Sequence, residues 1–146
     1  MTTNFEFVMP GQPPTWNHMY RWTTKTVNGK QIRIQVKTDE ASLYQSQLTM
    51  VARAAKPSDF KPVGQVIVAY EMLLDRNLDA DNVLKAVNDA LAVALDVNDK
   101  LFIPIVLMKT SGAAHPMLAI HVFDAHYFRT AVLDVEKWGP HWDPKR

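Results

Sequence analysis

The sequence predicts an α/β fold of the mixed α+β kind: a single domain with a mixed β-sheet, two main helices and a basic β-hairpin arm. The 146 residues fit one domain. Short β-prone segments alternate with two longer segments whose apolar residues recur at helical spacing. An Asn-Gly dipeptide separates two of the β-prone segments, as in a hairpin. The order strand, hairpin, helix, strand, helix, strand, strand therefore indicates one main sheet.

The first strand is predicted over residues 4–9, where the side chains alternate and are β-prone. The proline-rich residues 10–14 end it, because proline removes backbone donors and restricts the residue before it. A helix is predicted to begin at Thr38 or Asp39, either of which can act as its N-cap. This helix has an apolar stripe and ends at Pro57.

The arm is predicted from residues 20–27 and 30–36, which flank Asn28-Gly29. Asn-Gly tolerates the positive φ angles of a type I′ turn and is the strongest hairpin signal in the chain. Both strands are polar and basic, so we expect the arm to stand partly off the core.

The second half of the chain begins with a β-branched, apolar strand over residues 66–74. Residues 81–95 are the clearest helix, because their apolar side chains repeat at three- and four-residue steps and form one buried face. Two more strands are predicted over residues 101–108 and 117–123, with a turn at 111–113. We therefore divide the chain into a domain at 1–124 and a C-terminal tail of unknown role at 125–146.

Composition excludes several classes of protein. There are no cysteines, which rules out disulfides and thiolate zinc sites and suits a reducing cytosol. The chain has no apolar run of the roughly 18 to 20 residues that cross a bilayer, and no secretory signal is visible, so a cytoplasmic protein without a membrane partner is expected. Residues 1–37 carry five basic residues and one acidic residue, whereas 71–99 carry seven acidic and two basic. A basic arm before an acidic centre fits a phosphate-binding metal site.

Three carboxylates and one lysine carry the predicted chemistry. Asp79 and Asp81 lie between a predicted strand and a predicted helix, and residues two apart in extended chain point to the same side. They can therefore face one hard cation such as Mg²⁺, which takes oxygen ligands and keeps several waters. Lys85 lies one helical turn after Asp81 and could contact a scissile phosphate. Asp99 follows the helix and joins the pair only if the next strand packs suitably.

A purely structural interpretation stays open, because Asp-x-Asp is a common pattern. Asp81 could cap the helix, Asp79 could lie in a turn and Asp99 could be a solvated loop residue. The resemblance of residues 75–79 to a calcium loop fails, since alanines occupy the glycine and glutamate positions that such a loop requires. The histidines form no zinc signature, and His121 and His126 are expected near a strand end.

Several motifs together resemble the RusA family of Holliday-junction resolvases, which are phage- or prophage-type crossover junction endodeoxyribonucleases. The motifs are Pro13-Pro14-Thr15-Trp16-Asn17, Tyr20-Arg21, Glu40-x-x-x-Tyr44, Asp79-x-Asp81-Asn82-x-x-Lys85-x-x-x-Asp89-x-Leu91 and Asn98-Asp99. The similarity spans about residues 5–123. It implies that Asp79, Asp81 and Asp99 bind Mg²⁺, with Mn²⁺ as a substitute, and that Lys85 is catalytic.

The resemblance also implies a homodimer that acts on branched DNA. It would cut two strands of a four-way junction at symmetric positions, in recombination, repair or phage DNA processing. The ends would carry a 5′-phosphate and a 3′-hydroxyl. Two features depart from the family pattern. Asn98 replaces the first of two aspartates, and Asn77 and Leu78 stand where arginines are common, although Arg76 remains.

DNA binding is expected from the basic arm and from the loop before the first aspartate. The residues are Arg21, Lys25, Lys30, Arg33, Lys37 and Arg76. Trp16, Tyr20 and Trp22 could stack on unpaired bases or instead pack in a core or dimer contact. Two alternatives remain: another metal-dependent structure-specific nuclease, and a non-catalytic DNA-binding protein on the same fold.

Overall fold

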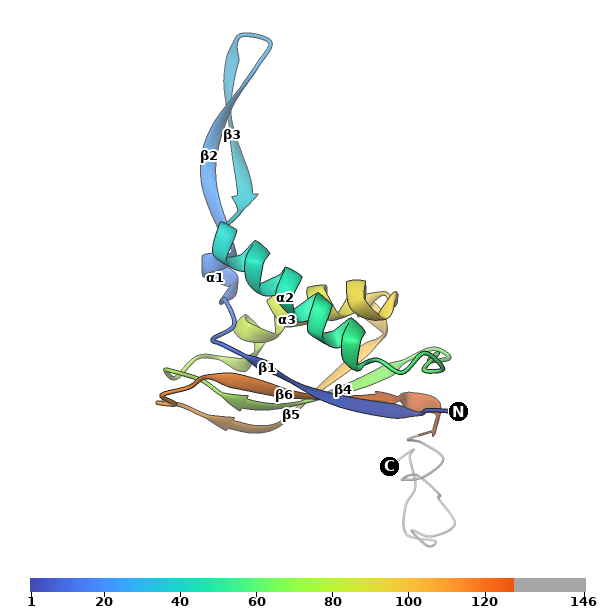
Figure 1. The fold of residues 1–146 in the computed structure, drawn as a ribbon. Helices are drawn as coiled ribbons and strands as arrows, with labels where there is room; N and C mark the ends of the chain where they lie inside the picture. Colours follow the sequence, from blue (N-terminus) through green and yellow to red (C-terminus); the bar gives the residue numbers. More distant parts are fainter. Residues whose placement is uncertain (128–146) are drawn as a thin grey trace, which may run out of the picture.

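A mixed β-sheet carries two helices on one face, and a hairpin projects from the body beyond the helices (Figure 1). The structure is a computed structural model and describes residues 1–127. The predicted mixed fold with one sheet, two main helices and an arm is confirmed. Most of the predicted tail, residues 128–146, lies outside the described residues.

The sheet has the strand order β1-β6-β4-β5. Its strands are β1 (Asn4–Pro10), β4 (Val66–Leu73), β5 (Phe102–Thr110) and β6 (Met117–Asp124). β6 is antiparallel to both of its neighbours, whereas β4 and β5 are parallel. A parallel pair needs a crossover connection, which α3 (Ala80–Leu95) supplies between β4 and β5. The carboxyl ends of β4 and β5 therefore meet at one edge of the sheet.

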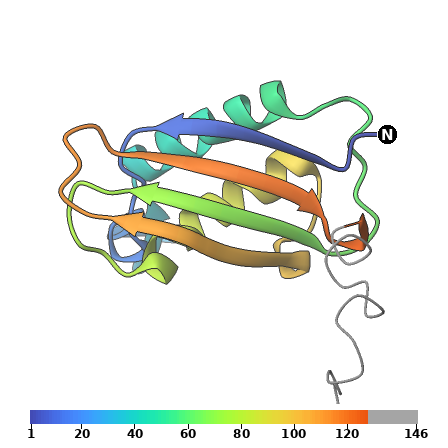
Figure 2. The ribbon, with the colours of Figure 1, turned by 90° about the horizontal axis from the view of Figure 1, so that it is seen from below.

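The core lies between the sheet and the two helices, α2 (Asp39–Ala55) and α3. Every second residue of β6 faces this core, and Leu118, Ile120 and Val122 are fully buried. The apolar face of α3 packs against them, as its three- and four-residue periodicity predicts. Seen from below, the sheet lies in front of both helices (Figure 2). In the described part of the chain, no helix is long and apolar enough to cross a membrane.

The arm is formed by β2 (Tyr20–Val27) and β3 (Lys30–Lys37), which pair only with each other. Asn28 and Gly29 both have positive φ, of 50° and 75°, as a type I′ turn requires. The arm stands clear of the body, as expected (Figure 1). Its base is held by a short helix that the sequence did not indicate, α1 (Trp16–Met19).

The base of the arm is fixed to both main helices. Met19 at the end of α1 is fully buried against Ala41 of α2 and Ala86 of α3, and Tyr20 packs on this cluster. The amide of Thr38, at the end of the arm, donates to the carbonyl of Met19 over 2.8 Å. The first residues of the arm thus have a defined position beside α3.

Thr38 is the predicted N-cap of α2, and it also links that helix to α1. Its hydroxyl accepts from the amide of Ala41 (3.3 Å) and donates to the carbonyl of His18 (3.0 Å). We expect Thr38→Ala to lower the free energy of unfolding by about 1 kcal/mol, because a helix amide loses its cap. Urea denaturation followed by circular dichroism measures this. Thr26→Ala, on the exposed arm, is the control and should change stability by much less.

The chain departs from prediction where α3 ends. Asp96 adopts the left-handed conformation (φ 56°) as the C-cap of α3, a position that usually favours glycine. A 3-10 turn, η1 (Asp99–Leu101), follows and is capped by the side chain of Asn98, which accepts from the amide of Lys100. The predicted strand 101–108 therefore begins one residue later and extends to Thr110.

His121 was wrongly expected near a strand end. It lies in the middle of β6, directly opposite Glu6 of β1. Its Nδ1 and Nε2 atoms are each 2.9 Å from a carboxylate oxygen, of Glu6 and Glu71 respectively. Each ring nitrogen of this histidine therefore has a carboxylate as its hydrogen-bonding partner.

Candidate active site at the start of helix α3

Asp79 and Asp81 flank the first residue of α3. Asp79 is the N-cap residue, with extended backbone (φ −68°, ψ 133°), and its side chain makes no capping hydrogen bond within the described residues. Asp81 is already in the first helical turn, so the assumption that both aspartates lie in extended chain is wrong for Asp81. Both residues are exposed. Their charges lie at the helix N-terminus, where the helix dipole favours anions.

Lys85 connects the helix to the residues that follow it. Its ammonium is 2.9 Å from Oδ1 of Asp89, one turn further along α3, and 3.7 Å from Oδ2 of Asp99. The structure thus brings Asp99 beside the lysine that lies one turn after Asp81. The chain after α3 thus folds back towards the helix, and that Asp99 joins Asp79 and Asp81 at one metal ion stays a prediction.

The fold-back depends on the end of α3. The left-handed Asp96 reverses the chain, and η1 then runs beside the helix. Asp99 is the first residue of η1, and its carbonyl accepts from the amide of Phe102, which closes the turn. Its carboxylate reaches the ammonium of Lys85 on α3. The left-handed residue Asp96 and the turn η1 together bring the carboxylate of Asp99 to Lys85.

The pKa of Lys85 is raised above its ordinary value. The main cause is the hydrogen bond to Asp89. Desolvation by burial lowers the pKa, and the charges of Asp89 and Asp99 and the nearby Tyr20 raise it again. Lys85 therefore carries its proton at neutral pH. A cation held in this place can stabilise a phosphate or a developing negative charge.

Asp89→Asn is expected to lower the pKa of Lys85, because the largest cause of the raised value is removed. The titration of ¹³C-dimethylated lysines by NMR measures this pKa, with Lys85→Arg used to assign its signal. The matched control is Asp59→Asn, which alters a carboxylate bonded instead to the amide of Thr2. An unchanged pKa in Asp89→Asn would contradict the assigned cause.

The loop before α3 is held by residues that were not predicted as part of the site. Lys109, near the end of β5, donates to the carbonyl of Leu78 (2.8 Å) and to Oδ1 of Asn77 (3.4 Å). Oε1 of Gln12, from the proline-rich loop, accepts from the amide of Asp75 (2.9 Å). The sequence could have indicated Lys109. It lies near the end of β5, and the carboxyl ends of the parallel strands β4 and β5 lie side by side.

The donor set suits a hard divalent cation, because Asp79, Asp81 and Asp99 offer only carboxylate oxygens. Within residues 1–127, however, no three histidine or carboxylate side chains are grouped closely enough to hold a metal ion as they stand. Mg²⁺ commonly binds through one or two carboxylates and keeps several waters, so it does not require such a closed group. The chemistry of these residues therefore fits Mg²⁺.

The arm carries its five predicted DNA-binding cations on both faces. The strand register places Arg33 and Lys37 on the face that also carries Trp22, and it places Arg21, Lys25 and Lys30 on the other. Residues 20–37 contain no acidic residue. The sixth predicted residue, Arg76, is exposed in the loop before α3 and lies 3.9 Å from Asp75. The arm is thus a positively charged ribbon.

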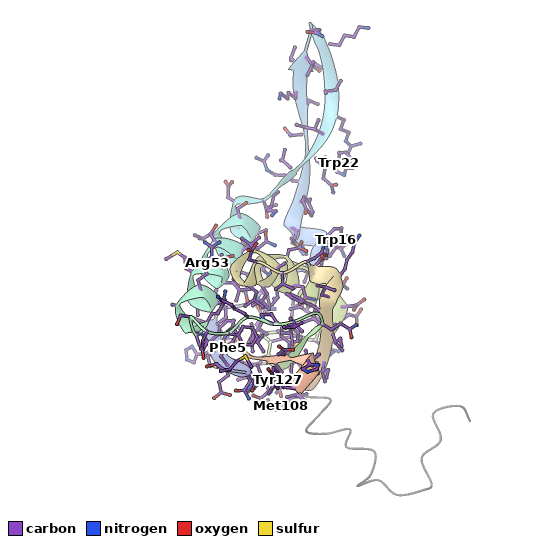
Figure 3. All side chains as sticks on the ribbon, turned by 90° about the vertical axis from the view of Figure 1, so that its right-hand side faces the viewer. Phe5, Trp16, Trp22, Arg53, Met108 and Tyr127 are labelled. Atoms are coloured by element: carbon purple, nitrogen blue, oxygen red, sulfur yellow. The ribbon has the colours of Figure 1, made fainter. Side chains whose placement is uncertain are left out.

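The three predicted stacking residues lie at and near the base of the arm. Trp22 lies on the arm (Figure 3) and is 58% exposed. The Arg33 guanidinium lies 4.7 Å from the centre of its ring. Trp16 is 44% exposed and contacts Tyr20 edge to face. Tyr20 packs on the buried cluster at the base. The packing alternative therefore describes Tyr20, whereas Trp22 offers an exposed ring.

Comparison of the sequence with protein-family models and with curated proteins gave no match.

Proposed function

We propose that this chain is a Mg²⁺-dependent endonuclease that cuts four-way DNA junctions in two symmetric strands. The observation that carries the proposal is the ion pair between Lys85 and Asp99, one helical turn from Asp81 and beside Tyr20 at the base of the basic arm. It joins one predicted carboxylate, that of Asp99, to the predicted catalytic lysine, near the base of a predicted DNA-binding element. The resemblance to the RusA family supports the same assignment.

Each residue has a separate task in the proposed reaction. Asp79, Asp81 and Asp99 would hold the divalent ion, which when bound polarises the phosphate and supplies hydroxide near neutral pH. Lys85 keeps its proton and contacts a non-bridging oxygen of the scissile phosphate or the leaving oxygen. Asp89 is a positioning residue, because its 2.9 Å bond holds the ammonium of Lys85 against α3.

The arm would hold the DNA next to these residues. Phosphates along a duplex arm pair with its cations, and this electrostatic term supplies most of the affinity that does not depend on sequence. The exposed ring of Trp22 is available to stack on an unpaired base at the crossover. The base of the arm packs directly on α3, so bound DNA would lie within reach of Lys85.

A homodimer would place two identical sites on a nearly two-fold junction. β5 offers a surface for it, because this edge strand exposes four consecutive apolar side chains between Pro104 and Lys109. They are Ile105, Val106, Leu107 and Met108. The second copy would cover them.

The proposed function is tested with a labelled immobile four-way junction, a flap and a linear duplex, each incubated with and without Mg²⁺. We expect paired nicks on the junction alone, at symmetric positions, with ends that ligase can seal. Cleavage of the flap or duplex at the same rate would identify the other class of structure-specific nuclease.

A second candidate function is DNA binding without catalysis. The basic arm favours it, because residues 20–37 carry five cations and no acidic residue and would bind DNA phosphates without any catalytic group. It predicts salt-dependent binding of the junction and no nicking with either Mg²⁺ or Mn²⁺. The same experiment separates the two candidates.

A further inference from the structure

A groove with a volume of about 570 Å³ runs between α2 and α3. Lys37 and Arg53 border it from the α2 side, at either end of that helix. Asp89 borders it from α3. Arg53 is one of the side chains marked in Figure 3, where it lies on the part of α2 away from the arm. Lys37 instead ends the arm itself.

The α2 wall of the groove is a polar stripe. Ser42, Ser46, Thr49 and Arg53 follow one another at steps of four, three and four residues, so they lie on one face of the helix. At 1.5 Å per residue this stripe is about 16 Å long. Along the axis of a duplex, each strand rises by about 3.4 Å per nucleotide, so the stripe spans the rise of about five nucleotides.

Lys37 and Arg53 each donate one hydrogen bond to a neighbouring group, which holds the cation at the groove. The Lys37 ammonium donates to Oε1 of Gln45 (2.6 Å), and this buried glutamine donates in turn to the carbonyl of Ala86 on α3 (2.9 Å). The Arg53 guanidinium donates to the carbonyl of Val93 (3.4 Å). An ammonium has three donors and a guanidinium has five, so each cation can still bind an anionic oxygen.

The groove opens next to the candidate active site. Asp89 lines it and is the same residue that bonds to Lys85. The charged residues of its lining are Lys37, Arg53 and Asp89, so the two cations outnumber the one carboxylate and the net charge of the groove is positive. A chain of phosphates leaving Lys85 could therefore continue along this surface without meeting an unpaired carboxylate in its walls.

We propose that the groove between α2 and α3 binds the sugar–phosphate backbone of the nucleic-acid strand that extends from the cleavage position. This inference rests on the proposed function. Lysine, arginine and hydroxyl side chains are the groups that contact phosphate and sugar, and they position a nucleic acid without reading its sequence. The walls of the groove combine these groups over the length of several nucleotides.

The test introduces the same charge at two neighbouring positions of α2. Ser46→Glu puts a carboxylate into the groove, whereas Gln47→Glu puts one on the exposed surface outside its wall. Affinity for a fluorescein-labelled four-way junction is measured by anisotropy without Mg²⁺ at several salt concentrations. We expect Ser46→Glu to weaken binding about tenfold and Gln47→Glu to weaken it much less. Arg53→Ala should reduce the salt slope by about one, and Lys61→Ala should not.

Equal affinities of Ser46→Glu and Gln47→Glu would overturn the groove assignment, as would an unchanged salt slope for Arg53→Ala. Cleavage by the wild-type protein with Mg²⁺ is measured in parallel. If it cuts the junction but the two glutamate variants bind alike, the proposed function stands and the groove assignment fails. If it binds with the expected difference between variants but cuts nothing, the nuclease proposal fails alone. If it binds no junction, both fail.

Discussion

Asp81→Asn is expected to reduce Mg²⁺-dependent junction cleavage at least about a thousandfold. A metal ion contributes several kcal/mol to stabilisation of the transition state, and each 1.4 kcal/mol corresponds to a factor of ten in rate. Asparagine keeps the size of the side chain and removes only its negative charge. Asp81 is exposed, so the fold should be unaffected and junction binding should stay within a few-fold of wild type. Single-turnover cleavage and anisotropy measure the two effects.

Asp75→Asn is the control, because Asp75 is an exposed aspartate of the loop that precedes α3 and lies outside the predicted ligand set. It should cut at nearly the wild-type rate. Equal rates for Asp81→Asn and wild type would show that Asp81 holds no catalytic metal.

Lys85→Met is expected to reduce cleavage about a hundred- to thousandfold, the range typical for removing one charge-stabilising donor from an active site. Methionine keeps the length and the helix propensity of the side chain but has no charge. The variant also leaves Asp89 and Asp99 without their ion pair, which adds negative charge beside the scissile phosphate. The rate should therefore fall at saturating junction concentration, with a small change in binding.

The control for Lys85→Met is Lys100→Met, which removes an exposed ammonium of the neighbouring 3-10 turn. Lys85→Arg should recover part of the activity, because it restores the charge with a different geometry. If Lys85→Met and Lys100→Met had the same rate, Lys85 would have no part in catalysis.

The elements that the sequence predicted best are those whose signal is local. Asn28-Gly29 determines the turn of the arm because both positions need positive φ, and the structure has it. The periodicity of residues 81–95 predicted α3 to within one residue, because one apolar face must be buried against the sheet. Thr38 acts as the N-cap of α2, as a threonine before Asp39 and Glu40 suggests.

Features that depend on distant parts of the chain were not predictable. The approach of Asp99 to Lys85 requires the left-handed Asp96, and aspartate there gives no strong sequence signal, unlike glycine. The helix α1 is stabilised by burying Met19 between α2 and α3, which local propensity does not reveal. The groove likewise depends on how these two helices pack, so Arg53 had no sequence signal as a candidate binding residue.

The most direct test of the metal site is an NMR titration of the full chain with Mn²⁺, which broadens the signals of nearby nuclei. We predict that the backbone amides of Asp79, Asp81 and Asp99 lose intensity first, and that Mg²⁺ restores them. Amides at the tip of the arm, around Asn28, should be unaffected. Broadening centred on other carboxylates, such as Glu6 and Glu71, or no selective broadening at all, would contradict a metal site at the start of α3.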